Sequence, residues 1–129
     1  MIYLDSSAVV KLVRREAETD ALRAWLASNA QPLVSSALVR TETARALTRA
    51  EPAALAVLPS VLALLYQRSV TDDLLDAAGR YSDPVLRSLD AIHLATAEEL
   101  SSVLMSFVTY DKRLADAGRA RGLQVAMPV

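Results

Sequence analysis

Residues 88 to 97, Ser88-Leu89-Asp90-Ala91-Ile92-His93-Leu94-Ala95-Thr96-Ala97, place one carboxylate at the start of an otherwise apolar helix. After Asp90 only His93 and Thr96 are polar, so both faces of the first two turns should be buried inside a domain. The free N–H groups and the dipole of a helix start can hold Asp90 ionised without a basic side chain. If this stretch is considered alone, the simplest interpretation is that Asp90 or Ser88 is the N-cap of the helix. A larger role for Asp90 depends on which other acids reach it.

The composition is that of a compact globular protein. The chain has 129 residues, 53% of them hydrophobic, and a mean hydropathy of +0.25, which fits one domain spanning residues 1–129. It contains no cysteine and one histidine, which excludes a disulfide framework and thiol redox chemistry and disfavours a zinc site of Cys and His. A net charge of −1 argues against an extended basic surface, so any polyanion must be bound locally.

The N-terminus and the longest apolar stretch both favour a cytoplasmic protein. The first residues carry no basic segment and reach an acid, Asp5, too early for a signal peptide. The apolar stretch from Ala53 to Tyr66 contains Pro59 and Ser60 and falls short of the ~20 residues that a membrane helix needs. We therefore expect a soluble protein in the cytoplasm.

Short apolar runs alternate with helical patterns along the chain. Strands are expected at residues 2–4, 32–36, 103–109 and 124–126, and more weakly at 69–71, with helices at 6–13, 22–29, 37–50, 73–80, 90–100 and 111–118. Residues 53–65 are expected to form one helix bent at Pro59 or two short helices without a polar face, and therefore a dimer or partner surface. This order predicts an α/β fold: an open, mostly parallel sheet of about five strands with helices on both faces.

Four acids are expected at one edge of this sheet, where ligands of open α/β folds bind. Asp5 directly follows the first strand, and Asp111 comes just after the strand that ends at residue 109. Asp90 starts a buried helix near that edge, and Glu42 lies in the helix after the second strand. Two charges ~5 Å apart repel by about 3 kcal/mol at an effective dielectric of 20, so four carboxylates imply a cation. Oxygen ligands favour Mg²⁺, with Mn²⁺ as a substitute, and such ions suit phosphodiester hydrolysis.

Each acid also has a purely structural interpretation. Asp5 and Asp111 fit N-caps, and Glu42 fits an ion pair with Arg45 three residues later. A non-catalytic dimerisation module whose acids are caps therefore stays open. A phospho-receiver-like signalling module is the other alternative, but it needs paired acids after its first strand, whereas Asp5 is single.

Three segments resemble the signature segments of PIN-domain ribonucleases, and more closely those of the VapC toxins of VapBC toxin-antitoxin modules. They are Tyr3-Leu4-Asp5-Ser6-Ser7-Ala8, residues 89–97 and Phe107-Val108-Thr109-Tyr110-Asp111-Lys112-Arg113-Leu114. The resemblance covers essentially the whole chain, in the right order and at the family's usual size. It implies an acidic Mg²⁺ site formed by Asp5, Glu42, Asp90 and Asp111. Ser7 and Thr109 would be hydroxyls that orient these carboxylates.

The resemblance also implies an activity and partners. The chain would be a cytoplasmic endoribonuclease acting on translation-related RNA such as tRNA, rRNA or mRNA, would be neutralised by a cognate VapB antitoxin, and would form a homodimer. The antitoxin could insert an Arg into the acidic cleft, with residues 53–65 as its docking groove or as the dimer seam. Basic residues near the acids could bind RNA phosphates or form a solvated surface: Lys11, Arg14, Arg15, Arg40, Lys112 and Arg113. His93 is interpreted as a packed histidine rather than a general base, and Asp116 as a solvated helix residue.

Overall fold

A computed structural model describes residues 1–129 and contains one five-stranded sheet with the order β3-β2-β1-β4-β5. All strand pairs are parallel. The strands are β1 (Ile2–Leu4), β2 (Leu33–Ser36), β3 (Leu65–Arg68), β4 (Ser106–Val108) and β5 (Val125–Ala126). Strand order reverses at β1, where Tyr3 pairs with Val34 on one side and with Phe107 on the other. The predicted α/β fold with a parallel sheet is therefore confirmed.

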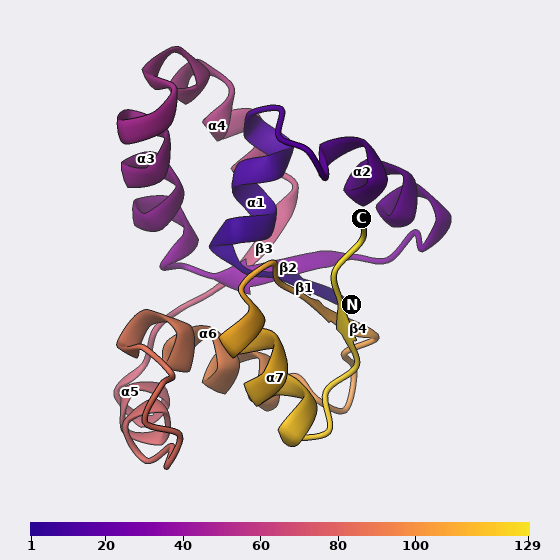
Figure 1. Cartoon of the computed structure of the whole chain (residues 1–129). Coiled ribbons are helices and arrows are strands. Elements are labelled where there is room, and N and C mark those ends of the chain that lie inside the picture. The colour runs from indigo at the N-terminus through magenta and orange to yellow at the C-terminus, as the bar shows by residue number, and fades with distance from the viewer.

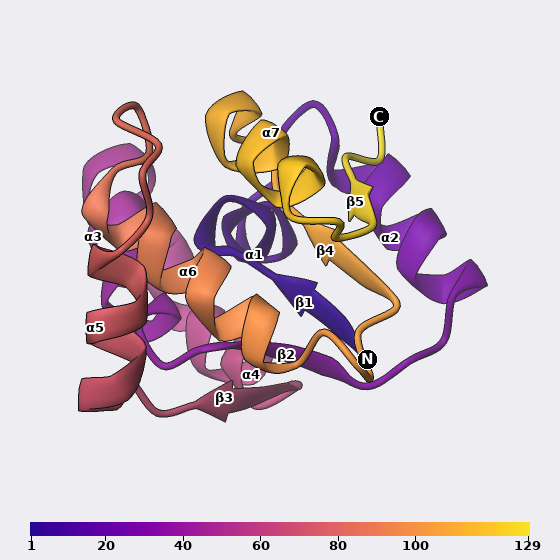
Figure 2. The same ribbon diagram turned by 90° about the horizontal axis from the view of Figure 1, so that it is seen from below.

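Helices cover both faces of the sheet, as the two layers in Figures 1 and 2 show. One face carries α1 (Ser6–Val13), α2 (Thr19–Ser28), α3 (Val39–Ala50), the short 3₁₀ helix η1 (Pro52–Ala56) and α4 (Leu58–Leu62). The other face carries α5 (Asp72–Gly79), α6 (Ser88–Glu99) and α7 (Lys112–Ala120).

The core is divided by the sheet because side chains of a strand alternate between its faces. Ile2 and Leu4 of β1 pack into a cluster with α1, α3 and α4, whereas Tyr3 between them packs into a cluster with α6 and α7. Residues 91–97 of α6 are all buried, which confirms the expectation that this helix runs through the interior. The starts of α1, α6 and α7 are thereby fixed relative to the ends of the central strands.

The third strand lies elsewhere than the sequence pattern predicted. The expectation of a strand at residues 69–71 was wrong: β3 is formed by residues 65–68, and Thr71 instead caps α5 by accepting a hydrogen bond from the N–H of Leu74. The reason is that β3 is an edge strand in which only Leu65 is buried, so it carries little apolar pattern of its own.

Residues 53–65 form two short helices, η1 and α4, which confirms the second of the two expectations, and the chain then enters β3 at Leu65. Pro59 is the second residue of α4, where its missing N–H costs no hydrogen bond. The fourth strand is also shorter than the predicted 103–109. None of the helices is long and apolar enough to span a membrane.

Candidate active site

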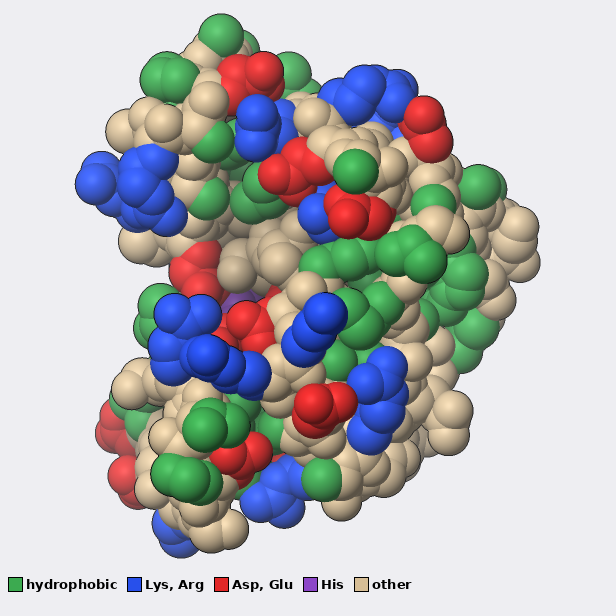
Figure 3. Space-filling view, viewed as in Figure 1, with side chains coloured by type: hydrophobic (Ala, Val, Ile, Leu, Met, Phe, Trp, Pro, Cys, Tyr) green, Lys and Arg blue, Asp and Glu red, His purple; other side chains and the backbone are tan.

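All four acids predicted from the sequence line one cleft at the carboxyl edge of the sheet. The cleft has a volume of about 440 Å³ and lies between α1 and α3 on one side and the starts of α6 and α7 on the other. Figure 3 shows it as a hollow between two lobes, with acidic side chains inside it beside the only histidine of the chain. Parallel strands explain this convergence because their carboxyl ends share one edge.

Asp5 forms the buried floor of the cleft. As the N-cap of α1, its Oδ1 accepts hydrogen bonds from the Ala8 N–H at 3.0 Å and the Ser7 hydroxyl at 2.6 Å. Its Oδ2 accepts one from the Thr109 hydroxyl at 2.6 Å. Burial raises the pKa of Asp5, while His93 and these three donors oppose that rise. The carboxylate is 3% exposed and fixed in direction.

The two hydroxyls also hold the loop that follows β4. Ser7 Oγ accepts a hydrogen bond from the Tyr110 N–H at 3.0 Å, and Thr109 Oγ1 accepts one from the Asp111 N–H at 3.1 Å. Asp111 is the N-cap of α7 and accepts from the Leu114 N–H at 2.9 Å. The N-cap interpretations of Asp5 and Asp111 are therefore correct, and both carboxylates line the cleft as well.

Asp90 is not an N-cap, and neither is Ser88. α6 begins two residues before Asp90 with Arg87 at the N-cap position, and no side chain caps this helix. Asp90 accepts no hydrogen bond; its Oδ2 lies 3.8 Å from Arg87 Nε, and Arg87 Nη2 lies 3.8 Å from Asp111 Oδ2. Burial raises the pKa of Asp90 and the charge of Asp111 raises it further, whereas Arg87 lowers it. A basic side chain, Arg87, therefore lies beside Asp90, a contact that was not predicted from the sequence.

Glu42 faces a partner that sequence spacing does not indicate. It lies in the first turn of α3 and forms no ion pair with Arg45; instead its Oε1 lies 2.6 Å from Nε2 of His93. His93 Nδ1 lies 2.7 Å from the hydroxyl of Tyr3. With 1% of its surface exposed, His93 is the packed histidine that the sequence predicted.

The basic residues of the cleft differ from those expected. Lys11 lies over the ring of Tyr110 and pairs with Glu16 and Glu18, so it is not free to bind phosphate. Arg14 and Arg15 likewise pair with acids of the turn before α2 and its first residues. Arg40, Lys112 and Arg113 are exposed but do not line the cleft. Asp116 is exposed, pairs with Arg119 and lies outside the cleft, as predicted.

The cleft is lined by three arginines that were not expected to bind RNA: Arg45, which was expected only to pair with Glu42, and Arg49 and Arg87. Helical spacing could have found them. Arg45 and Arg49 follow Glu42 by three and seven residues, and Arg87 precedes Asp90 by three, which places each on the same helix side as an acid.

A family model described as the PIN domain matches residues 2–120, which include all four carboxylates. The chain belongs to the PIN-domain family. Ribonuclease VapC35 of Mycobacterium tuberculosis is 46% identical over 131 residues, which cover 99% of this chain and 97% of that protein. Ribonuclease VapC46 of the same organism is 47% identical over 127 residues, which cover 98% and 97%. The chain is thus a VapC-type PIN domain, as its three signature segments indicated.

Two solved structures share the PIN fold at low sequence identity. The crystal structure of Mycobacterium tuberculosis VapC20, described as a toxin that cleaves the sarcin-ricin loop, has a TM-score of 0.75 at 20% identity and covers 92% of this chain and 95% of its own. A structure of FitAB bound to a DNA fragment has a TM-score of 0.67 at 18% identity, with 98% and 94% covered. At these identities the likeness concerns the fold.

The carboxylate oxygens of this PIN domain's cleft suit a hard divalent cation, although the four side chains do not meet at one point. No group of three or more Asp, Glu, His or Cys side chains has the geometry to hold a metal ion. Arg87 lies between two of the carboxylates, and Asp5 is bound by hydroxyl and amide donors. The cleft nevertheless offers four carboxylates and no thiol, and burial together with the charges of Asp111 and Asp5 raises the pKa of Asp90. An added cation would relieve that repulsion.

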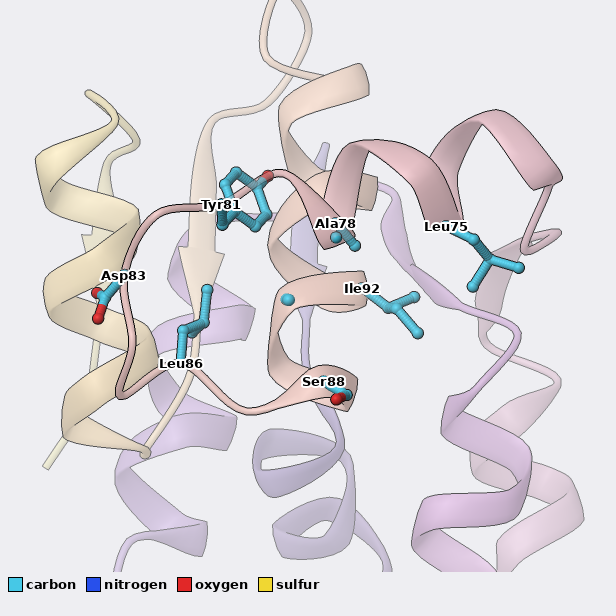
Figure 4. A pocket seen from close by; sticks show the side chains of 9 residues that line it. Leu75, Ala78, Tyr81, Asp83, Leu86, Ser88 and Ile92 are labelled. Atoms are coloured by element: carbon cyan, nitrogen blue, oxygen red, sulfur yellow. The ribbon is translucent and has the colours of Figure 1, made fainter.

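A second cavity of the PIN domain, with a volume of about 380 Å³, carries no comparable chemistry. It lies between α5, the loop after it and α6, where Figure 4 shows Leu75, Ala78, Leu86 and Ile92 around it. Its single carboxylate, Asp83, accepts a hydrogen bond from the backbone N–H of Val85. The acidic cleft is therefore the candidate active site.

Proposed function

We propose that this PIN domain is a metal-dependent endoribonuclease toxin. The observation that carries the proposal is the convergence of Asp5, Glu42, Asp90 and Asp111, from four separate segments, on one cleft. A module whose acids are only caps would explain Asp5 and Asp111, which cap helices, but not Asp90, which caps nothing. Near relatives named as ribonucleases support RNA as the substrate.

The four carboxylates would hold Mg²⁺, or Mn²⁺ in its place. Such a cation assists the attack of water on a phosphodiester and offsets the charge that develops on the phosphate. The chain's own contribution is to fix the ligands. Ser7 and Thr109 orient Asp5, while Asp90 and Asp111 lie across the cleft without a hydroxyl partner of their own. Carboxylates held in this way set the direction from which a cation and its water act.

Arginines around the acids would bind the RNA backbone. Arg45, Arg49 and Arg87 line the cleft, and guanidinium groups bind phosphate oxygens in a bidentate manner without reading sequence. Translation-related RNA such as tRNA, rRNA or mRNA, in the cytoplasm, is the expected substrate. The solved neighbour described as cleaving the sarcin-ricin loop supports ribosomal RNA among these classes.

A VapB-type antitoxin would hold the enzyme inactive, which the relatives' VapC names and the FitAB neighbour support. An antitoxin Arg could enter the cleft and neutralise the carboxylates. The segment from η1 to β3 leaves Val57, Leu64 and Tyr66 exposed, and this surface would be the antitoxin groove or the seam of a homodimer. Light scattering of the wild type and of Leu64→Ser with Tyr66→Ser tests the dimer.

The test of the activity is cleavage of RNA by purified protein, followed by sequencing of the RNA ends. We expect cuts in Mg²⁺ or Mn²⁺, none in EDTA, and none with Asp90→Asn, whose melting temperature should be kept or raised. Asp116→Asn is the matched control because Asp116 lies on the surface outside the cleft. Cleavage that survives EDTA, or that survives Asp90→Asn, would contradict the proposal.

A further inference from the structure

We propose that His93 is a positioning residue that fixes the carboxylate of Glu42 in the cleft, and that Tyr3 fixes the ring of His93. The proposal rests on the proposed function, because it gives His93 a task at that same active site. It explains why the only histidine of the chain lies buried between a core strand and a cleft acid.

Three segments meet in this contact. Tyr3 of β1 is fully buried, and its ring lies edge-on to the ring of His93 of α6, with centroids 5.8 Å apart and an interplanar angle of 82°. Glu42 comes from α3 on the opposite face of the sheet. The imidazole therefore links the core to the cleft wall.

The hydrogen atoms that link Tyr3, His93 and Glu42 can be assigned from the donors and acceptors around them. The Ser36 N–H donates to the Tyr3 hydroxyl at 3.1 Å, so the hydroxyl hydrogen needs an acceptor of its own. Nδ1 of His93, at 2.7 Å, is the acceptor that the structure offers. Burial raises the pKa of Tyr3 far above its usual value, which keeps that hydrogen in place. Nε2 of His93 then carries the ring hydrogen and donates it to Glu42 Oε1 at 2.6 Å.

This arrangement leaves Glu42 with one oxygen bound and one oxygen free at the cleft. A glutamate side chain otherwise loses rotamer entropy when it is ordered, and the contact with His93 makes that ordering part of the fold. His93 itself does not reach substrate, because it is 1% exposed and its Nε2 hydrogen is committed to Glu42. It acts through Glu42.

The spectroscopic test uses the fact that the chain has one histidine, so nitrogen-15 spectra of imidazole report His93 alone. In the metal-free wild type we expect the neutral ring with hydrogen on Nε2 and a bare Nδ1. Glu42→Ala should shift the Nε2–H signals, whereas Glu51→Ala, at the end of the same helix, should not. A ring protonated at Nδ1, or signals unmoved by Glu42→Ala, would overturn the proposal.

The functional test compares two amides in place of the imidazole. The amide nitrogen of Gln reaches the position of Nε2, whereas that of Asn reaches the position of Nδ1. His93→Asn is expected to weaken Mn²⁺ binding, measured by calorimetry, and cleavage by about 10- to 100-fold, with His93→Gln recovering most of the loss. Tyr3→Phe should give a smaller loss, and Tyr81→Phe none, because the Tyr81 hydroxyl binds Glu98 away from the cleft.

Equal activity and equal Mn²⁺ affinity in the Asn and Gln variants would contradict the positioning role. If neither variant folds, the spectra of the wild type and Glu42→Ala still decide the contact, since Glu42 lines the cleft and is not part of the apolar core. If the wild type cuts no RNA under any condition, the proposed function fails while the ring spectra still test the link between His93 and Glu42.

Discussion

The two sides of the acidic cleft hold their carboxylates in opposite ways. Asp5 is buried and accepts three hydrogen bonds, from Ser7, Ala8 and Thr109. Asp90 accepts none and has only Arg87 at 3.8 Å, with a guanidinium that is largely exposed. The Asp5 side is therefore preorganised by the fold, whereas the Asp90 side carries charge that the fold leaves incompletely neutralised. We infer that Asp5 determines the position at which a cation binds. The Asp90 side chain then adjusts to the bound cation.

The largest expected effects come from removing one carboxylate from each side. Asp5→Ala and Asp90→Ala should each lower cleavage by roughly 1,000-fold or more, equivalent to about 4 kcal/mol. Their stabilities should differ. Asp5→Ala removes an N-cap and leaves the buried hydroxyl of Thr109 and the half-buried hydroxyl of Ser7 without their acceptor, so thermal melting should show a loss of about 2 kcal/mol. Asp90→Ala should melt at or above the wild-type temperature, because no hydrogen bond is lost.

Asp116→Ala is the control for both substitutions, since it removes an exposed acid of α7 that lies outside the cleft. If Asp90→Ala destabilised the protein as much as Asp5→Ala, the contrast between a fixed and an adaptable side would be wrong.

The next effect concerns the hydroxyls that orient Asp5. Thr109→Val keeps the shape of the side chain but removes the donor to Asp5 Oδ2 and the acceptor for the Asp111 N–H. Cleavage at fixed Mg²⁺ should fall by about 10- to 100-fold. Thr48→Val, which removes a hydroxyl bound to the backbone of α3 outside the cleft, should leave cleavage unchanged. Equal rates for the two variants would show that Asp5 needs no hydroxyl to orient it.

A smaller effect is expected at Arg87, the basic side chain that lies beside Asp90 and Asp111. Removing an exposed positive charge near two carboxylates is worth about 1 kcal/mol at most, so Arg87→Ala should strengthen Mg²⁺ binding by about fivefold or less. Calorimetric titration measures it, with Arg119→Ala, at the ion pair to Asp116, as the control. Weaker Mg²⁺ binding in Arg87→Ala would mean that Arg87 supports the site rather than competing at it.

The smallest effect is a pH dependence of stability without metal. A carboxyl whose pKa is raised in the folded state stabilises the fold while protonated, and this stabilisation is lost as pH rises from its ordinary value of 3.8 through the raised value. In EDTA, the melting temperature of Asp90→Asn relative to wild type should therefore increase with pH between about 4 and 7. A difference that stays constant over this range would argue against a raised pKa at Asp90.

Sequence patterns predicted the centre of this fold better than its edges. β1, β4 and α6 are buried and carry continuous apolar runs, so their type is plain from the residues. β3 was not predicted because only Leu65 of its four residues is buried, and the apolar residues just before it favoured a helix. The four cleft acids could be selected because parallel strands end at one edge.

Contacts between distant segments could not be predicted. Glu42 and His93 are 51 residues apart, and nothing in the chain pattern links them, although the structure brings them to 2.6 Å. The N-cap expectation at Asp90 failed because α6 starts two residues earlier than its apolar pattern does. Arg87 then lies before the helix, where its side chain reaches two carboxylates.

The central claim is that Asp5, Glu42, Asp90 and Asp111 bind a divalent cation, and thermal melting with Mg²⁺ or Mn²⁺ tests it most directly. A ligand present at 100 times its Kd stabilises the folded state by about 2.7 kcal/mol, so the wild type should melt several degrees higher with the cation than in EDTA. Asp90→Asn should show little or no such rise, while Asp116→Asn keeps it. A wild type that does not respond to the cation, or an Asp90→Asn variant that responds equally, would contradict the account.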